Sequence, residues 1–181
     1  MEISNHILLA ASQIPSPNQS RRPDGEQPSL LVIHNISLPP GEFGGPFIHD
    51  LFCNTLDCSQ HEFFREIGDL RVSAHLLIRR DGWLVQYVPF NRQAWHAGAS
   101  CFQGRECCNE FSLGIELEGT DAGPFTDRQY RVLAAVTKVL MHTYPLLTPD
   151  RIVGHSDIAP GRKTDPGPGF DWNQYRRSIQ S

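Results

Sequence analysis

The chain has 181 residues, a length typical of a single domain of about 100–200 residues. Apolar residues make up 39% of it and charged residues 20%, which is enough for a hydrophobic core and excludes a disordered chain. The 16 Lys and Arg against 20 Asp and Glu give a net charge of −4, without the basic excess of proteins that bind nucleic acids or anionic membranes. No apolar run approaches the ~20 residues of a membrane span.

The amino-terminal segment and the cysteines favour a cytoplasmic protein. The segment MEISNHILLAASQIPSP has no basic start, and its apolar run, residues 7–11, is shorter than the ~7–15 residues of a signal-peptide core. A secreted domain held together by disulfide bonds would carry an even number of cysteines, so we expect the cysteines of this chain to be free thiols. The five cysteines, an odd number without a Cys-x-x-Cys pair, are Cys53, Cys58, Cys101, Cys107 and Cys108.

The first half of the chain predicts one buried strand, helical pieces and a hairpin. Residues 15–29 are rich in turn formers and predict a loop that leads into the core. Residues 30–34 form an apolar run that ends in a histidine, typical of a strand buried on both faces. Apolar residues then recur at helical spacing within 46–67. Residues 72–79 and 83–89 predict a hairpin with an Asp-Gly turn.

The second half alternates strands and helices. Residues 112–118 place Leu113, Ile115 and Leu117 on one face of a strand and Gly114, Glu116 and Glu118 on the other. Residues 126–143 predict a helix with a capping box at its start. A short strand at 152–153 and a terminal helix near 172–179 follow. This alternation predicts an α/β fold with a mixed sheet, in one domain over 1–181 whose core spans about 28–175.

Three residues predict a metal site. His34 and His155 each follow a short apolar strand, so their imidazoles meet at one edge of the sheet if those strands are neighbours. Asp165 comes ten residues after His155, in a segment too rich in Pro and Gly to be a helix. Two imidazoles and a carboxylate are ligands of a catalytic zinc, with a fourth position for water. The alternative is a hydrogen-bonded pair of histidines with an aspartate that caps a turn.

Two further polar residues could carry out chemistry beside that metal. Glu116 faces away from the apolar side of its strand and could take a proton from the attacking water. It could equally belong to an ordinary solvated face. Lys163 lies in the loop that contains Asp165 and offers a compact positive charge. The chain lacks a Gly-x-Ser-x-Gly elbow, a P-loop and a Gly-x-Gly-x-x-Gly turn, which argues against serine-hydrolase and nucleotide-binding chemistry.

Several stretches together resemble one known family, the zinc amidases that include phage T7-type lysozymes and peptidoglycan recognition proteins. The similarity extends from about Pro15 to Trp172. It implies a central mixed β-sheet flanked by helices, the type 2 N-acetylmuramoyl-L-alanine amidase fold, with one Zn²⁺ per chain. The stretches that carry the resemblance are LLVIHNISLPPGEFGGPFI, RVSAHLLIRRDGWLVQYVPF, AWHAGAS, GRECCNEFSLGIELEGTD and GHSDIAPGRKTDPGPGFDW.

The resemblance also implies roles for single residues. Matches to the family's motifs make His34, His155 and Asp165 the zinc ligands and Glu116 and Lys163 the catalytic pair. The residues that match segments bordering the family's substrate groove are Asn35, Arg71, Trp95 and His96. Trp95 could instead pack in the core.

One position departs from the family. Cys107 stands where close relatives often have arginine, so a peptide carboxylate would need another contact, for which Arg105 or Arg71 are candidates.

The resemblance implies a cytoplasmic enzyme that removes the stem peptide from 1,6-anhydro-N-acetylmuramic acid by cleaving the lactyl–L-Ala amide. It would act in cell-wall recycling and thereby affect β-lactamase induction, without an obligate protein partner. The alternatives are a peptidoglycan-binding module that has lost catalysis, and an endolysin-like amidase that acts on intact wall. The presence of all three metal ligands and both catalytic candidates favours an enzyme over the binding module. An endolysin-like amidase would normally need a route across the membrane or a wall-binding domain, and neither is visible in the sequence.

Overall fold

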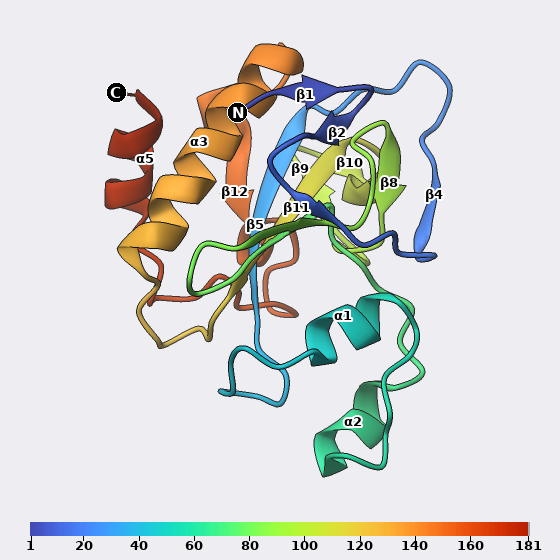
Figure 1. Ribbon diagram of the computed structural model, residues 1–181. Coiled ribbons are helices and arrows are strands. Elements are labelled where there is room, and N and C mark those ends of the chain that lie inside the picture. The colour runs from blue at the N-terminus through green and yellow to red at the C-terminus, as the bar shows by residue number, and fades with distance from the viewer. Residues whose placement is uncertain (181) are drawn as a thin grey trace.

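Six strands form a mixed sheet at the centre of the computed structural model, which describes residues 1–180 (Figure 1). In spatial order the strands are β12 (Ile152–Gly154), β5 (Leu30–Ile36), β11 (Ser112–Glu118), β6 (Leu76–Ile78), β7 (Leu84–Gln86) and β3 (Ser12–Gln13). The first four of these strands run parallel, β7 is antiparallel to β6, and β3 is parallel to β7. The mixed α/β sheet predicted from the sequence is confirmed.

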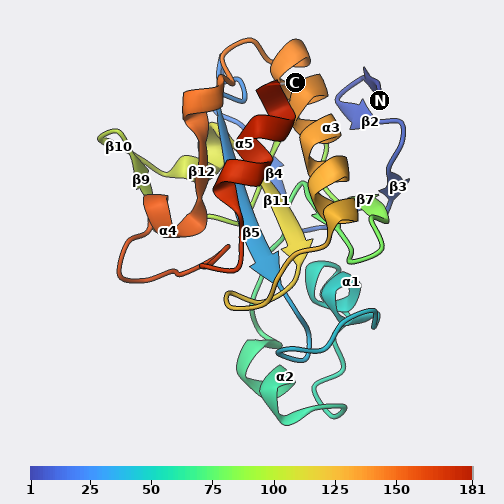
Figure 2. The ribbon, with the colours of Figure 1, turned by 90° about the vertical axis from the view of Figure 1, so that its left-hand side faces the viewer.

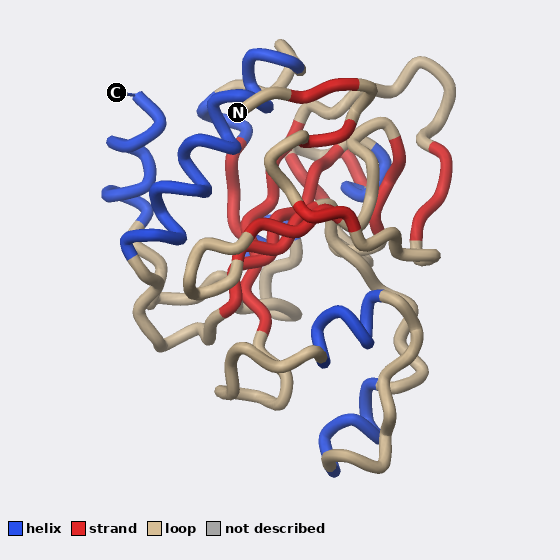
Figure 3. Tube along the Cα trace, in the orientation of Figure 1, coloured by secondary structure: helices blue, strands red, loops and turns tan. Residues whose placement is uncertain are grey.

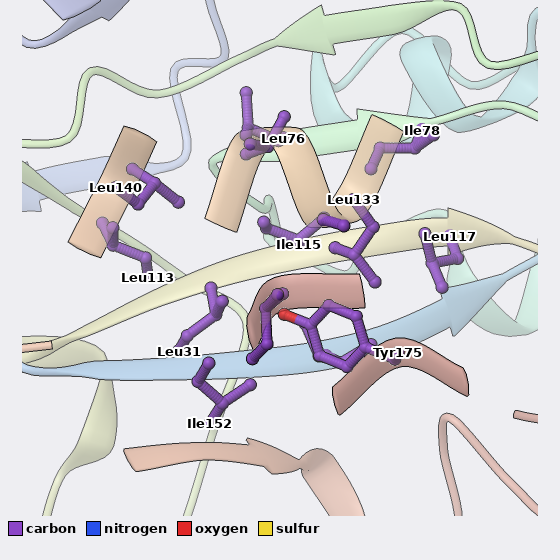
Figure 4. Close-up of a cluster of buried hydrophobic side chains, with 14 of the residues drawn as sticks. Leu31, Leu76, Ile78, Leu113, Ile115, Leu117, Leu133, Leu140, Ile152 and Tyr175 are labelled. Atoms are coloured by element: carbon purple, nitrogen blue, oxygen red, sulfur yellow. The ribbon is translucent and has the colours of Figure 1, made fainter. Parts of the chain in front are cut away.

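Two long helices cover one face of this sheet. Helices α3 (Asp127–Thr143) and α5 (Trp172–Gln180) lie side by side across β5 and β11 (Figure 2). Figure 4 shows Leu133 of α3 and Tyr175 of α5 packed against Leu31 and Ile115 of the strands. The strand 112–118 is confirmed with its predicted alternation. Helix α3 is also confirmed, and its predicted capping box is present.

The opposite face of the sheet carries buried polar side chains among apolar ones. Leu30 and Val32 of β5 pack there with Phe111 and Ile158. Because side chains alternate along a strand, His34 shares this face with Leu30 and Val32, away from α3.

Shorter elements surround the sheet. Helices α1 (Phe47–Phe52) and α2 (Glu62–Ile67) lie beyond the carboxyl end of β5, where Figure 3 shows them below the strands. None of the helices within residues 1–180 is long and apolar enough to cross a membrane. The remaining elements are the antiparallel pairs β1 (Ile3–Ser4) with β2 (Ile7–Leu8), β4 (Gln19–Arg21) with β8 (Arg92–Ala94), and β9 (Cys101–Phe102) with β10 (Arg105–Glu106), the one-turn helix α4 (His155–Ile158), and the 3₁₀ turns η1 (Cys108–Glu110) and η2 (Pro149–Arg151).

The structure differs from the sequence-based expectations at the amino terminus and after β12. The segment 15–29, expected as a loop, contains β4, and residues before the expected core boundary supply β3 and the fully buried Leu8. These strands have two or three residues and pair with distant segments, so no periodic pattern reveals them. The segment after His155, expected to be non-helical, opens with the single turn α4.

Candidate metal centre and active site

The sheet register brings three polar residues together. Strand β5 lies between β12 and β11. Gly154 pairs with Ile33, so His155 follows directly beside His34, and Glu116 lies opposite His34 on the other side. The neighbouring strands that the metal hypothesis required are therefore present.

Three side-chain atoms converge in this place. His34 Nδ1 lies 3.0 Å from His155 Nδ1 and 2.9 Å from Asp165 Oδ2, and His155 Nδ1 lies 3.1 Å from the same oxygen. Ligands about 2.1 Å from a tetrahedral zinc are ~3.4 Å apart, so small outward shifts would accommodate the ion. This is a group of three potential metal ligands in the part of the chain that the structure describes.

The protonation of the ligand atoms fits a cation. Burial lowers the pKa of His34 to about 4, so its imidazole is neutral at pH 7. His155 Nε2 lies 3.2 Å from the carbonyl oxygen of Ala97, which can only accept, so the proton of this imidazole belongs on Nε2. His155 Nδ1 then directs a lone pair at another acceptor, Asp165 Oδ2. A positive ion between these atoms relieves that repulsion, and the residues therefore fit a zinc ion.

Glu116 is a buried carboxyl group beside the three ligands. Its Oε2 has no hydrogen-bond partner within residues 1–180, although the group is 9% exposed. Burial raises the pKa of Glu116 well above its ordinary value, the Asp165 carboxylate raises it further, and the Lys163 ammonium opposes both. A carboxyl group in this state suits proton transfer.

The converging residues line a cavity of about 220 Å³. All predicted ligands and both predicted catalytic residues border it, and so do three of the four predicted groove residues. The cavity is lined by His34, Asn35, Ile36, Phe52, Leu70, Val72, Ser73, Trp95, His96, Glu116, His155, Lys163 and Asp165.

Two of the predicted groove residues are held in place by side-chain hydrogen bonds. Asn35 donates through Nδ2 to Asp121 Oδ1 at 2.7 Å, and Trp95 donates through Nε1 to Ser20 Oγ at 3.0 Å. Trp95 is half-buried in the cavity wall rather than enclosed in the core. Its ring is therefore available to a ligand in the cavity.

The arginines considered for peptide binding lie elsewhere. Arg71 is exposed, donates to nearby backbone carbonyls and does not border the cavity among the described residues. Arg105 is paired with Glu26 at 2.6 Å. Cys107 is exposed and lines a separate hollow together with Arg162. The structure does not bring Arg71 or Arg105 to the cavity.

Sequence reasoning missed the polar groups behind the histidines. His96, expected at the groove, also contacts His34, with 2.9 Å between its Nδ1 and His34 Nε2. The Ala97 carbonyl and the Asn109 side chain likewise lie within hydrogen-bond distance of the groups around the site. Their roles depend on tertiary contacts, and no local pattern in the sequence marks them.

Comparison with known proteins gives consistent matches. A family model described as N-acetylmuramoyl-L-alanine amidase matches residues 24–168. The chain is 63% identical over 172 residues to the 1,6-anhydro-N-acetylmuramyl-L-alanine amidase AmpD of Salmonella typhimurium, covering 95% of this chain and 91% of that protein.

Two solved structures extend the comparison. A crystal structure of an AmpD derivative superposes with a TM-score of 0.97 at 58% identity, over 99% of both chains. The amidase AmiD of E. coli, solved with the substrate anhydro-N-acetylmuramic acid-L-Ala-D-γ-Glu-L-Lys, has a TM-score of 0.61 at 30% identity, covering 87% of this chain and 60% of that one.

Proposed function

Because the chain belongs to the N-acetylmuramoyl-L-alanine amidase family, we propose that it hydrolyses the lactyl–L-Ala amide of 1,6-anhydro-N-acetylmuramyl peptides. In this proposal His34, His155 and Asp165 hold one zinc ion. The observation that carries it is the convergence of their three ligand atoms, all within 3.1 Å of one another, beside the buried and unpartnered Oε2 of Glu116.

The cavity residues divide the chemistry among them. Zinc bound at the three ligands would supply a Lewis acid for the amide carbonyl and make water nucleophilic near neutral pH. Glu116 orients the attacking water, accepts its proton and passes that proton to the departing amine of L-Ala. The carbonyl oxygen becomes negative as water attacks. The Lys163 ammonium, which borders the same cavity, stabilises that charge.

The sugar half of the substrate has a candidate surface in the same cavity. The half-buried ring of Trp95 offers an apolar face against which a compact bicyclic sugar can stack. The AmiD complex, which holds an anhydro-N-acetylmuramic acid peptide, supports a sugar of this class. Trp95 is therefore central to the proposed specificity for the sugar.

The proposal extends to the cellular role. High identity to proteins named as 1,6-anhydro-N-acetylmuramyl-L-alanine amidases supports a place in peptidoglycan recycling. We propose action in the cytoplasm on released muropeptides, and through them an indirect effect on β-lactamase induction. A binding module without catalysis is the less favoured function, because every proposed ligand and catalytic residue is present around the cavity.

Kinetics with two matched substrates test this function. We expect kcat/KM for an anhydro-N-acetylmuramyl peptide to exceed that for the reducing-end N-acetylmuramyl peptide with the same stem. Trp95→Ala should reduce this ratio while the zinc content of the protein stays unchanged. Equal turnover of both sugars by the wild type would contradict the proposed substrate. Absence of turnover of either would contradict the proposed function.

A further inference from the structure

We propose that the dipeptide His96-Ala97 fixes both zinc-binding histidines in the form that presents Nδ1 to the metal, and that Asn109 holds this dipeptide in place. His96 and Asn109 are thus positioning residues, and the inference rests on the zinc site of the proposed function. One short segment would control the tautomer and the ring orientation of ligands that come from two different strand ends.

The first contact is a chain of hydrogen bonds that leads from His34 through His96 to Ser112. His34 Nε2 lies 2.9 Å from His96 Nδ1, and His96 Nε2 lies 3.1 Å from Ser112 Oγ. If His34 Nδ1 faces the metal, its Nε2 carries the proton and donates to His96 Nδ1. His96 then carries its own proton on Nε2 and donates to Ser112. Every nitrogen in this chain of hydrogen bonds has one role that is consistent with zinc at His34 Nδ1.

The second contact comes from the next residue. The carbonyl oxygen of Ala97 lies 3.2 Å from His155 Nε2, and it also accepts from the Arg162 guanidinium at 2.6 Å. A carbonyl oxygen has two lone pairs and can accept both bonds. It cannot donate, so it directs the proton of His155 to Nε2 and leaves Nδ1 for the metal.

Asn109 fixes the backbone that carries both contacts. Its Oδ1 accepts from the backbone N–H of His96 at 3.1 Å and from that of Ala97 at 2.8 Å. A single side-chain oxygen therefore sets the position of both groups that touch the ligands.

Gly114 leaves the room that the His96 ring requires. A Cβ at this position of β11 would come within 2.5 Å of His96 Cγ, closer than side chains pack. Since β11 lies beside β5, the ring reaches His34 only because this neighbouring strand has no side chain there.

Groups that hydrogen-bond to metal-ligating histidines have a characteristic effect on metal affinity. Their loss typically weakens metal binding or activity about 10–100-fold, because the imidazole loses its fixed tautomer and orientation. A residue that serves only the packing of the fold would instead change stability without changing metal affinity.

The test measures zinc affinity by competition with a chelator, and the absorption spectrum after cobalt(II) is substituted for zinc. We expect one zinc per wild-type chain. His96→Leu removes the acceptor and should bind zinc about 10–100-fold more weakly, with an altered cobalt spectrum. His96→Asn keeps an acceptor near the position of Nδ1 and should recover most of the affinity and the wild-type spectrum.

A second pair of variants and a control keep the inference testable if His96→Leu fails to fold. Asn109→Ala should weaken zinc binding, and Asn109→Asp, which keeps an oxygen acceptor, should restore it. The control is His49→Leu, which replaces a half-buried histidine that bonds to Tyr87 Oη and Arg79 Nη2 and lies outside the cavity of the ligands. It should lower thermal stability and leave zinc affinity unchanged.

The outcomes separate this inference from the proposed function. If wild-type protein binds zinc and the His96 and Asn109 variants bind it equally well with unchanged cobalt spectra, the positioning role is wrong. The same conclusion follows if His49→Leu weakens zinc binding as much as His96→Leu. If the wild type itself binds no zinc, the proposed metal site fails and the inference fails with it.

Discussion

Glu116 shows how stability and chemistry oppose each other at a single residue. It is buried on the face of the sheet opposite α3, its Oε2 lacks a partner among the described residues, and the Asp165 carboxylate is nearby. Ionising such a group costs free energy that the folded protein must carry. The free-energy cost of this buried carboxyl group indicates that Glu116 is present for its function, and the function that we propose for it is proton transfer.

This opposition predicts that Glu116→Gln stabilises the metal-free protein at neutral pH. The folded state raises the pKa of Glu116 above its unfolded value, so the folded state binds a proton that the unfolded state has lost. Stability from this group is therefore present below the unfolded pKa and lost as pH rises through the folded pKa. Thermal unfolding of metal-free protein should show a higher Tm for the variant at pH 7, with the difference shrinking toward pH 4. A lower Tm for the variant across this range would contradict the argument.

The catalytic pair gives a second prediction at this scale. Glu116→Ala should lower kcat about 10²–10⁴-fold, as expected for loss of a general base. Lys163→Ala should lower it about 10²–10³-fold, as expected for loss of one group that stabilises the oxyanion. Zinc content measured by metal analysis should stay at the wild-type level in both. A variant that lost zinc together with activity would place its residue among the ligands instead.

The chemically distinctive residues could be predicted from the sequence, but the groups that hydrogen-bond to them could not. His34 and His155 could be found because each follows an apolar run, although β5 continues past His34 to Ile36, and Glu116 could be found because its strand alternates strictly. The hydrogen bond between His96 and His34 joins segments far apart in the chain and depends on a glycine in a third. Such a contact has no local signature.

At the scale of elements, a buried ion pair ties the loop after β5 to the sheet. Arg79 donates to Glu118 Oε1 at 3.0 Å, and both side chains are buried. The same carboxylate accepts from the backbone N–H groups of Gly44 at 2.7 Å and Arg80 at 3.1 Å. Glu118 thus joins the loop that leads to α1 with the hairpin between β6 and β7.

Glu118→Ala should therefore lower the free energy of unfolding by about 3–5 kcal/mol, because it leaves the Arg79 charge buried without its partner. Urea unfolding of the zinc-loaded protein measures this. The control is Asp24→Ala, which removes an exposed partner of Arg21 and should leave stability unchanged. Equal effects of the two substitutions would show that burial does not matter to this pair.

Elements with a periodic or continuous apolar pattern were predicted well, including the hairpin strands β6 and β7 and the short strand β12, whereas β3 and β4 near the amino terminus were not. The seven residues of β11 and the seventeen of α3 match the expected segments because burial imposes a period on them. The two- and three-residue strands β3 and β4 are held by pairing with β7 and β8. These two segments, Ser-Gln and Gln-Ser-Arg, are wholly polar and show no apolar alternation that could be detected.

At the scale of the whole molecule, the five cysteines are spread over different environments. All are free, as expected from their odd number. Cys108 is fully buried in the cluster with Leu30 and Phe111, while Cys101 and Cys107 are exposed. Burial raises the pKa of the Cys108 thiol, which keeps it protonated and unreactive.

These environments predict different costs for removing the thiols. The double variant Cys101→Ser, Cys107→Ser should keep wild-type stability and turnover. Cys108→Ser should lower Tm, because it places a hydroxyl in an apolar cluster, yet it should retain catalysis when folded. Loss of turnover in the double variant at normal zinc content would give the exposed thiols a role in the reaction.

We propose that this chain cleaves an anhydromuramyl peptide through a metal held by His34, His155 and Asp165. The most direct measurement is mass spectrometry of the products formed from 1,6-anhydro-N-acetylmuramyl-L-Ala-γ-D-Glu-meso-diaminopimelate. It compares protein stripped by a chelator with the same protein after zinc is restored. We expect intact substrate with stripped protein, and free tripeptide plus 1,6-anhydro-N-acetylmuramic acid once zinc is returned. Equal cleavage by both samples, or no cleavage by the restored protein, would contradict it.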